Sequence, residues 1–453
     1  MDLVIKNGRV AVSSYLRNSA IGVRNGKILW IGSNSNAPKA RDVIDASGLV
    51  VLPGVIDPHV HLRDPGMTYK EDFGTGTAAA AAGGITTIFD MPNNVPPTRD
   101  VESLEVKKVQ AAKKAMVDYA LYGLLTAGNK DDIDPLIQAG VIGFKFYMGE
   151  TTGRLAPPPD GELLDDFELL SKGGMRASVH AEDDAILQHN IAKLRKMKRT
   201  DTKAHFESRP EAVEKEAVHR AIILAREGSC KLHIAHLSSA GGAREVREAK
   251  LARRQKDSTG PVTSETCPQY LMLDEDDYDA KGAFMKANPS IKRKEDRLAL
   301  WKAIGDGTVD MIASDHAPHT AQEKTRGASV FDKPSGFPGL ETSVALMLTS
   351  VDQGRLSLFK YVKLTSENPA KAWGLYPRKG KIAVGADADF TVVDTREEWK
   401  IDPAKFVSKA KYSPFDDTKV KGRAVYTIVR GNIVMDHGVV DRQSRGEMLR
   451  PLT

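Results

Sequence analysis

The sequence predicts an α/β protein in which a (β/α)8 barrel of the TIM type is joined to a small β-sandwich domain built from both chain ends. Through the middle of the chain, short β-branched runs alternate with helical patterns, which is the sequence signal of such a barrel. Both chain ends instead carry apolar stretches separated by turn signals, which is typical of small sheets. A chain of 453 residues is long enough for a large barrel and a smaller second domain.

The two chain ends are predicted to build the sandwich together. Residues 1–53 contain the stretches LVIKNGRV, AIGVRNGKILWIG and LVVLPG, and the Asn-Gly pairs at 7–8 and 25–26 are strong hairpin signals. Residues 376–453 repeat this pattern in KGKIAVGADADFTVVD and VYTIVRGNIVM. We therefore expect these two segments to flank a barrel that spans residues 54–375.

The barrel segment reads as strands followed by helices. GITTIFDM precedes SLEVKKVQAAKKA, CKLHIAHLSS precedes GGAREVREAKLARR, and further strands are predicted at VIGFKFYM, RASVHAE and VDMIASDHA. Polar residues suited to chemistry fall at the ends of these strands. In such barrels the active site forms at the C-terminal face, from the strand ends and the loops that follow them. We therefore expect these residues to meet.

Composition and charge argue against several functional classes. Apolar residues make up 41% of the chain and charged residues 28%, which is ordinary for a soluble globular protein. The net charge of +5 is spread along the chain, and the basic run KLRKMKR has no interleaved aromatic residues, so we expect no nucleic-acid partner. We find no signal peptide and no run of ~18 apolar residues, and only Cys230 and Cys267 are present. These features predict a cytoplasmic protein without a membrane partner.

Four histidines and one aspartate occupy the predicted strand ends. His59 and His61 lie two apart in VIDPHVHLRDPG, so both imidazoles project to the same face of a strand. Such a pair alone is also compatible with two structural histidines. His180, His236 and Asp315 each end a further apolar run. Because imidazole and carboxylate groups bind zinc and related divalent ions, the whole set predicts a metal site.

Two residues close to this set need separate interpretation. His233 lies three residues before His236, towards the other side of the strand, and we interpret it as a structural histidine. Lys145 lies inside the apolar run VIGFKFYMG, where burial of an ammonium group is costly. One interpretation is that the side chain extends its charge to the strand end. The other is that burial lowers its pKa, so that the neutral amine takes up carbon dioxide and the carbamate bridges two metal ions.

The ordered motifs HVHLRDPG, GFKFYMGETTG, HAED, HIAHLSS and SDHAPH resemble the amidohydrolase superfamily, in particular the cyclic amidohydrolases that include dihydroorotases, allantoinases and hydantoinases. The resemblance implies two divalent metal ions, with zinc as the expected metal, and a bridging hydroxide that attacks a ring carbonyl. The residues that it implies are His59 and His61 for the first ion, His180 and His236 for the second, carboxylated Lys145 between both, and Asp315 as a ligand of the first ion and the catalytic acid and base.

Three further residues favour a substrate that carries a carboxylate: Arg63, Asn93 and His319. An arginine offers a planar fork that suits a carboxylate. In dihydroorotases the matching residues bind the substrate carboxylate, whereas allantoinases and hydantoinases usually lack this arginine, and allantoinases tend to read MPLN where this chain reads MPNN. Asn288 in ANPSIK and Thr151 in the ETTG loop match further substrate contacts. The expected function is that of a dihydroorotase, which reversibly hydrolyses dihydroorotate to N-carbamoyl-aspartate in pyrimidine biosynthesis.

Other interpretations stay open. Gln269 stands where relatives commonly carry a histidine, and KAHFESRPEAVEKEAV resembles allantoinases. The alternatives are therefore allantoinase, hydantoinase or dihydropyrimidinase, and, in a different class, a catalytically silent scaffold on the same fold. Such scaffolds typically lose metal ligands, and this chain retains all of them. We also expect SGFPGLET at 335–342 to shape the pocket with backbone groups.

Two expectations concern partners. We expect a homo-oligomer, and we consider an association with other pyrimidine-pathway enzymes.

Overall fold

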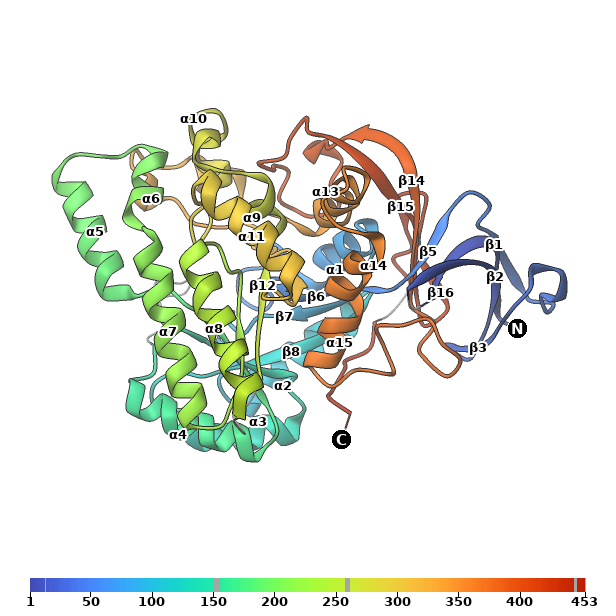
Figure 1. Ribbon diagram of the computed structural model, residues 1–453, viewed down its shortest axis with the longest axis horizontal. Coiled ribbons are helices and arrows are strands. Elements are labelled where there is room, and N and C mark those ends of the chain that lie inside the picture. Colours follow the sequence, from blue (N-terminus) through green and yellow to red (C-terminus); the bar gives the residue numbers. More distant parts are fainter. Residues whose placement is uncertain (13, 150–154, 156, 257–260, 444–445, 453) are drawn as a thin grey trace.

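The computed structural model describes residues 1–12, 14–149, 155, 157–256, 261–443 and 446–452. It confirms the predicted architecture. Parallel strands form a nearly closed eight-stranded barrel, and both chain ends form a separate sheet beside it (Figure 1).

The barrel strands follow one another in sequence order, and every neighbouring pair is parallel. The first and last strands meet where the His61 N–H donates to the His316 carbonyl at 2.8 Å. Most strand residues are buried, as expected for a parallel sheet covered on its outer face by helices. The strands are β6 (Val55–Val60), β7 (Ile85–Asp90), β8 (Asp118–Leu124), β9 (Gly143–Tyr147), β10 (Arg176–His180), β11 (Lys231–Ile234), β12 (Val262–Thr266) and β13 (Met311–Ile312).

Helices pack around the outside of these strands, as Figure 1 shows. Within the described residues, none is long and apolar enough to cross a membrane. The α-helices are α1 (Phe73–Ala82), α2 (Val101–Lys114), α3 (Ile133–Ala139), α4 (Asp160–Lys172), α5 (Asp184–Lys196), α6 (Thr202–Ser208), α7 (Glu211–Glu227), α8 (Ala240–Lys256), α9 (Pro268–Met272), α10 (Tyr278–Lys281), α11 (Lys294–Asp306), α12 (Ala321–Thr325), α13 (Leu340–Asp352), α14 (Leu358–Val362) and α15 (Asn368–Ala372). The shorter helical turns are η1 (Asn34–Asn36), η2 (Lys130–Asp132), η3 (Glu275–Asp277), η4 (Gly282–Met285), η5 (Val330–Asp332), η6 (Lys363–Glu367) and η7 (Pro403–Lys405).

The second sheet combines strands from both chain ends, as predicted. Its strand order is β17-β16-β15-β14-β5-β1-β2-β3, and β4 pairs with β1. Figure 1 shows these N-terminal and C-terminal strands side by side at one end of the molecule. We keep the domain boundaries after residues 53 and 375 as a proposal. The strands are β1 (Leu3–Val12), β2 (Tyr15–Arg24), β3 (Lys27–Gly32), β4 (Asp42–Asp45), β5 (Val50–Pro53), β14 (Phe390–Lys400), β15 (Lys419–Val429), β16 (Asn432–Asp436) and β17 (Val439–Val440).

The two Asn-Gly pairs of the N-terminal segment have different roles. Asn25 and Gly26 both have a positive φ in the tight turn between β2 and β3, which confirms the predicted hairpin. The hairpin prediction for the pair at 7–8 is wrong, because Asn7 and Gly8 lie inside β1. Asn7 has a φ of 64°, and the pairing of β1 with β2 shifts register here. This irregularity separates the part of β1 that pairs with β4 from the part that pairs with β5.

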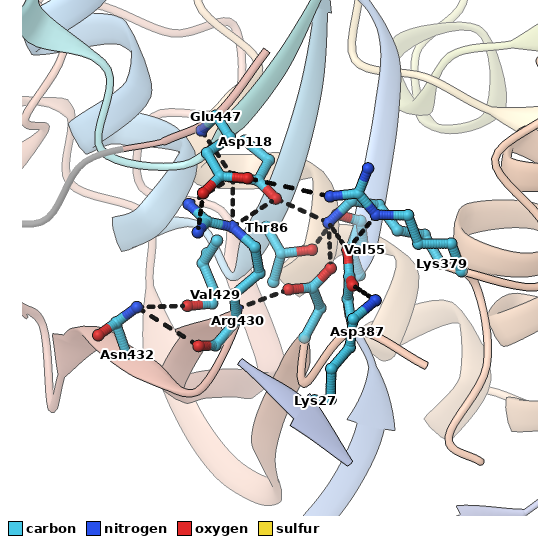
Figure 2. Close-up of polar contacts among 12 residues, drawn as sticks. Lys27, Val55, Thr86, Asp118, Lys379, Asp387, Val429, Arg430, Asn432 and Glu447 are labelled. Carbon is cyan, nitrogen blue, oxygen red and sulfur yellow. Dashed lines mark hydrogen bonds and ion pairs between the residues drawn. The ribbon is translucent and has the colours of Figure 1, made fainter. Parts of the chain in front are cut away.

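A buried charge network connects the second sheet to the barrel (Figure 2). The Lys379 ammonium is almost fully buried and forms ion pairs with Asp389, with Asp387 at 3.4 Å, and with Asp118, the first residue of β8, at 2.8 Å. Arg430 pairs with the other oxygen of Asp118 at 3.1 Å. The three aspartates lie close enough to suggest a metal site. We interpret them instead as the acidic partners of Lys379, whose ammonium already lies among them.

Replacing Lys379 with Met should destabilise the protein strongly. The change leaves buried carboxylates without their cation, and breaking a buried pair in this way typically costs ~3–5 kcal/mol. The free energy of unfolding from denaturant titration measures the effect. Lys27→Met is the matched control, because Lys27 pairs with the same Asp387 while remaining 46% exposed, and exposed pairs contribute at most ~1 kcal/mol. Equal losses in the two variants would contradict the assigned role of Lys379.

Candidate metal and active site

The predicted metal ligands meet at the C-terminal ends of the barrel strands. Together with Arg63, Asn93 and Asn288, most of them line one cavity of about 50 Å³. Lys145 is fully buried. The predicted ligands are His59 within β6 and His61 just after it, Lys145 within β9, His180 at the end of β10, His236 two residues after β11, and Asp315 three residues after β13.

The first group consists of His59, His61 and Asp315. Nε2 of each histidine lies 3.4 Å from Oδ1 of Asp315, and the three side chains offer ligand atoms within 4.8 Å of one another. The opposite ring nitrogens are engaged elsewhere: Nδ1 of His59 contacts Glu265, and Nδ1 of His61 lies 2.7 Å from Oδ1 of Asn93. Both Nδ1 atoms are therefore donors, which leaves the Nε2 lone pairs for a metal ion.

The second group consists of His180 and His236. Nδ1 of His180 lies 2.9 Å from Nε2 of His236, while Nε2 of His180 contacts Glu182 at 3.0 Å. The rings of His59 and His236 have centroids 5.1 Å apart, so the two groups are neighbours. Burial lowers the pKa of His59 to about 4 and that of His236 well below its usual range. These imidazoles are therefore neutral, as metal ligands must be.

Lys145 lies close enough to both groups to lower the pKa of His59 and of His236 through its charge. Its side chain is fully buried, and its ammonium nitrogen has no hydrogen-bond partner within the described residues. Burial lowers its pKa to about 8, which increases the fraction of the nucleophilic neutral amine. A bare buried ammonium without a partner is costly, whereas a carbamate that binds metal ions would be satisfied. The donor set thus fits a site for divalent metal ions.

Three site residues have left-handed backbone conformations. Arg63, His236 and Asp315 have φ values of 62°, 35° and 48°. This region is unfavourable for residues other than glycine, and such strain concentrates at functional sites. Each of the three lies two or three residues after a barrel strand, and each lines the cavity. Burial also raises the pKa of the Asp315 carboxyl, a shift that suits a group exchanging protons.

The predicted substrate residues are placed in different ways. Arg63 and Asn288 line the cavity, and the buried atoms Nη1 of Arg63 and Oδ1 of Asn288 have no hydrogen-bond partner in the described part of the chain. Asn93 lines the cavity too, but its amide oxygen is engaged by His61. His319 lies behind Arg63, where its Nε2 donates to the Ser335 carbonyl at 3.0 Å, and it does not line the cavity. Thr151 lies outside the described residues.

Two glutamates that the sequence analysis missed support the histidines. Glu265, the fourth residue of β12, contacts His59 and His233, and Glu182 contacts His180. Glu182 lies in the HAED motif, two residues after His180, so alternate-residue spacing was an available signal for it. Glu265, which begins ETCPQYL, lies far from His59 in the chain and had no such local signal. Gln269 is buried, and its amide donates to the Ser314 carbonyl at 3.4 Å. The segment 335–342 was expected to shape the pocket, and two of its residues, Ser335 and Gly336, line the cavity.

A parallel barrel with histidine, lysine and aspartate side chains gathered at its strand ends defines a class, the metal-assisted hydrolases built on this barrel. The chain belongs to the amidohydrolase family, whose model matches residues 50–434. It is 37% identical to a dihydroorotase of Methanosarcina mazei over 99% of this chain and 97% of that one. It is 34% identical to an allantoinase of Solibacter usitatus over 99% and 97% of the two chains. The solved structure of L-hydantoinase from Arthrobacter aurescens superposes with a TM-score of 0.95, at 36% identity and 99% coverage of both chains.

The protein is therefore an enzyme, a cyclic amidohydrolase of the dihydroorotase, allantoinase and hydantoinase type. Its relatives divide among these three activities, and overall similarity does not separate them. The residues that surround the cavity must carry the choice of substrate.

Proposed function

We propose that the enzyme is a dihydroorotase, which reversibly hydrolyses the ring amide of dihydroorotate to N-carbamoyl-aspartate. One observation carries this proposal: the buried Arg63 guanidinium lines the cavity and forms no ion pair with any of the residues that the structure describes. Dihydroorotate is a cyclic amide with a carboxylate, so it brings both the bond to be cleaved and the missing anion. The hydantoin ring itself brings only the first of these.

The surroundings of Arg63 support a bound anion. Within the described residues Arg63 forms no ion pair; its Nε donates to the Pro318 carbonyl at 3.2 Å, and Nη1 is unsatisfied. Burial lowers the pKa of its guanidinium even though the nearby Asp315 charge acts in the opposite direction. A substrate carboxylate would accept hydrogen bonds from the guanidinium and remove this cost. Asn288 supplies a further polar group in the same cavity.

The protein side chains divide the chemical work. Two bound divalent ions, which we propose to be zinc, would supply the Lewis acidity that activates water and polarises the ring carbonyl. His59, His61, His180 and His236 would hold them together with carboxylated Lys145. The Asp315 carboxylate would take a proton from the attacking water and deliver it to the ring nitrogen as the amide bond breaks. Arg63 and Asn288 would orient the substrate.

Replacing Arg63 tests the substrate assignment. Arg63→Lys should lower kcat/KM for dihydroorotate by roughly 30- to 5,000-fold, because truncating one partner of a buried charge pair costs ~2–5 kcal/mol and an ammonium lacks the planar fork. Turnover of a hydantoin without a carboxylate is the internal control and should change little. Metal content should stay at the parent level. If kcat/KM of Arg63→Ala for dihydroorotate is within about threefold of the parent value, the loss is too small for a lost charge pair. The proposed carboxylate site would then be wrong.

A hydantoinase is the second candidate, since the L-hydantoinase structure superposes closely over almost the whole chain. Allantoinase is retained on the similarity to the Solibacter usitatus enzyme. The catalytically silent scaffold is not retained, because the chain belongs to a family of cyclic amide hydrolases. We further propose that the enzyme is cytoplasmic, forms a homo-oligomer and uses a small anionic substrate; an association with other pyrimidine-pathway enzymes stays a prediction.

A further inference from the structure

A single buried carboxylate, Glu265, lies behind both groups of proposed metal ligands. One of its oxygens, Oε1, contacts Nδ1 of His59 and also accepts the backbone N–H of His236 at 3.2 Å. The other oxygen, Oε2, lies 3.1 Å from Nε2 of His233. Glu265 is 1% exposed, so three protein donors replace water around its charge. It contacts the side chain of a ligand in the first group and the backbone of a ligand in the second.

His233 extends this contact away from the cavity. Its Nδ1 lies 2.9 Å from the Thr263 hydroxyl, so both of its ring nitrogens are engaged. Because the carboxylate of Glu265 can only accept, Nε2 of His233 carries the proton and Nδ1 accepts from Thr263. The same reasoning places the proton of His59 on Nδ1. The order of donors and acceptors therefore fixes the tautomers of both histidines.

We propose that Glu265 and His233 are positioning residues for the metal site. Glu265 holds His59 with Nε2 as its ligand atom and holds the strained backbone of His236, and His233 in turn fixes Glu265. His233, which the sequence analysis interpreted as structural, thereby acts on the metal site through Glu265. This inference rests on the proposed metal-dependent function.

Glu265→Gln is the informative substitution because it keeps the shape and removes one acceptor. The new amide group must face either His59 or His233. If the amide N–H group faces His59, the proton of His59 must move from Nδ1 to Nε2, and Nε2 loses the lone pair that would bind the metal ion. If it faces His233, the amide N–H group and the Nε2–H group of His233 are two donors that point at each other. In both orientations His59 also loses the negative charge that raises its basicity as a ligand.

The test is zinc binding by the full-length protein after chelator treatment. Glu265→Gln should raise the dissociation constant of both ions by ~10- to 100-fold, the usual effect of losing an outer partner of a metal-binding histidine. Glu341→Gln is the control, because Glu341 is a half-buried glutamate whose carboxylate accepts the backbone N–H groups of Val407 and Ser408 and contacts none of the proposed metal ligands. Its zinc affinity should equal that of the parent. The unfolding temperatures of the two metal-free variants should be similar, which separates positioning from a general loss of stability.

If the zinc affinity of Glu265→Gln is within about threefold of the parent, the change is smaller than the usual effect of losing an outer partner. That result would overturn the positioning proposal and leave the proposed function standing. A parent protein that binds no divalent metal would overturn both. If Glu265→Gln does not fold, two variants of His233 decide. His233→Gln retains a donor for Glu265, whereas His233→Leu retains none, so His233→Gln should bind zinc more tightly than His233→Leu. Equal zinc affinities of His233→Leu and the parent would overturn the proposal.

Discussion

Lys145→Ala should abolish turnover and deplete the enzyme of metal. The lysine is fully buried and has no hydrogen-bond partner within the described residues, and we propose that its carbamate bridges both metal ions. Alanine removes the only proposed ligand shared by the two ions, so the loss should affect metal content and catalysis together. Elemental analysis of the purified variant and an assay with dihydroorotate measure the two effects.

Two further measurements separate the carbamate from the lysine itself. Lys145→Arg keeps a cation at this position but cannot take up carbon dioxide in the same way, so it should be as inactive as Lys145→Ala. Short carboxylic acids added to Lys145→Ala should restore part of the activity, because a carboxylate resembles a carbamate in shape and charge. Full activity and full metal content in Lys145→Ala would show that the residue plays neither role.

Asp315→Asn should keep substantial metal yet lose turnover by ~10²–10⁴-fold, the usual contribution of a positioned proton-transfer group. The amide retains an oxygen for the metal ion but no longer accepts a proton. Burial raises the pKa of the Asp315 carboxyl, and its Oδ1 lies 3.4 Å from Nε2 of both His59 and His61. The measurement is kcat with dihydroorotate after metal reconstitution.

Asp310→Asn is a matched control for this substitution. Asp310 precedes β13, at the opposite end of the strand from Asp315, and it pairs with Lys250 at a partly exposed position. Its replacement should leave kcat close to that of the parent. Near-parent turnover in Asp315→Asn as well would remove Asp315 from the proposed proton transfer.

The barrel and the gathering of the metal ligands were predictable from sequence because they depend on local pattern. Each strand is a short apolar run, and the residue that ends it must lie at one face of a parallel barrel. The second sheet was predictable for a similar reason, since both chain ends carry alternating stretches and turns. The hairpin signal at Asn7 failed because a left-handed residue suits a bulge as well as a turn.

The outer partners of the histidines were not predictable in the same way. Glu265 of β12 contacts His59 of β6, 206 positions away in the chain, and no local spacing indicates that contact. The MPNN motif indicated that Asn93 contacts the substrate, but its side-chain oxygen is engaged by Nδ1 of His61. His319 likewise contacts Arg63 rather than the cavity. Motifs identify which residues gather, whereas hydrogen bonds between distant segments decide what each residue touches.

The most direct test of the central claim is turnover by the zinc-loaded enzyme with dihydroorotate, N-carbamoyl-aspartate, allantoin and hydantoin measured side by side. The arrangement around Arg63 predicts that dihydroorotate is hydrolysed and N-carbamoyl-aspartate is cyclised, both with far higher kcat/KM than the two other compounds show. Efficient hydrolysis of allantoin or hydantoin, with no activity on dihydroorotate, would contradict it.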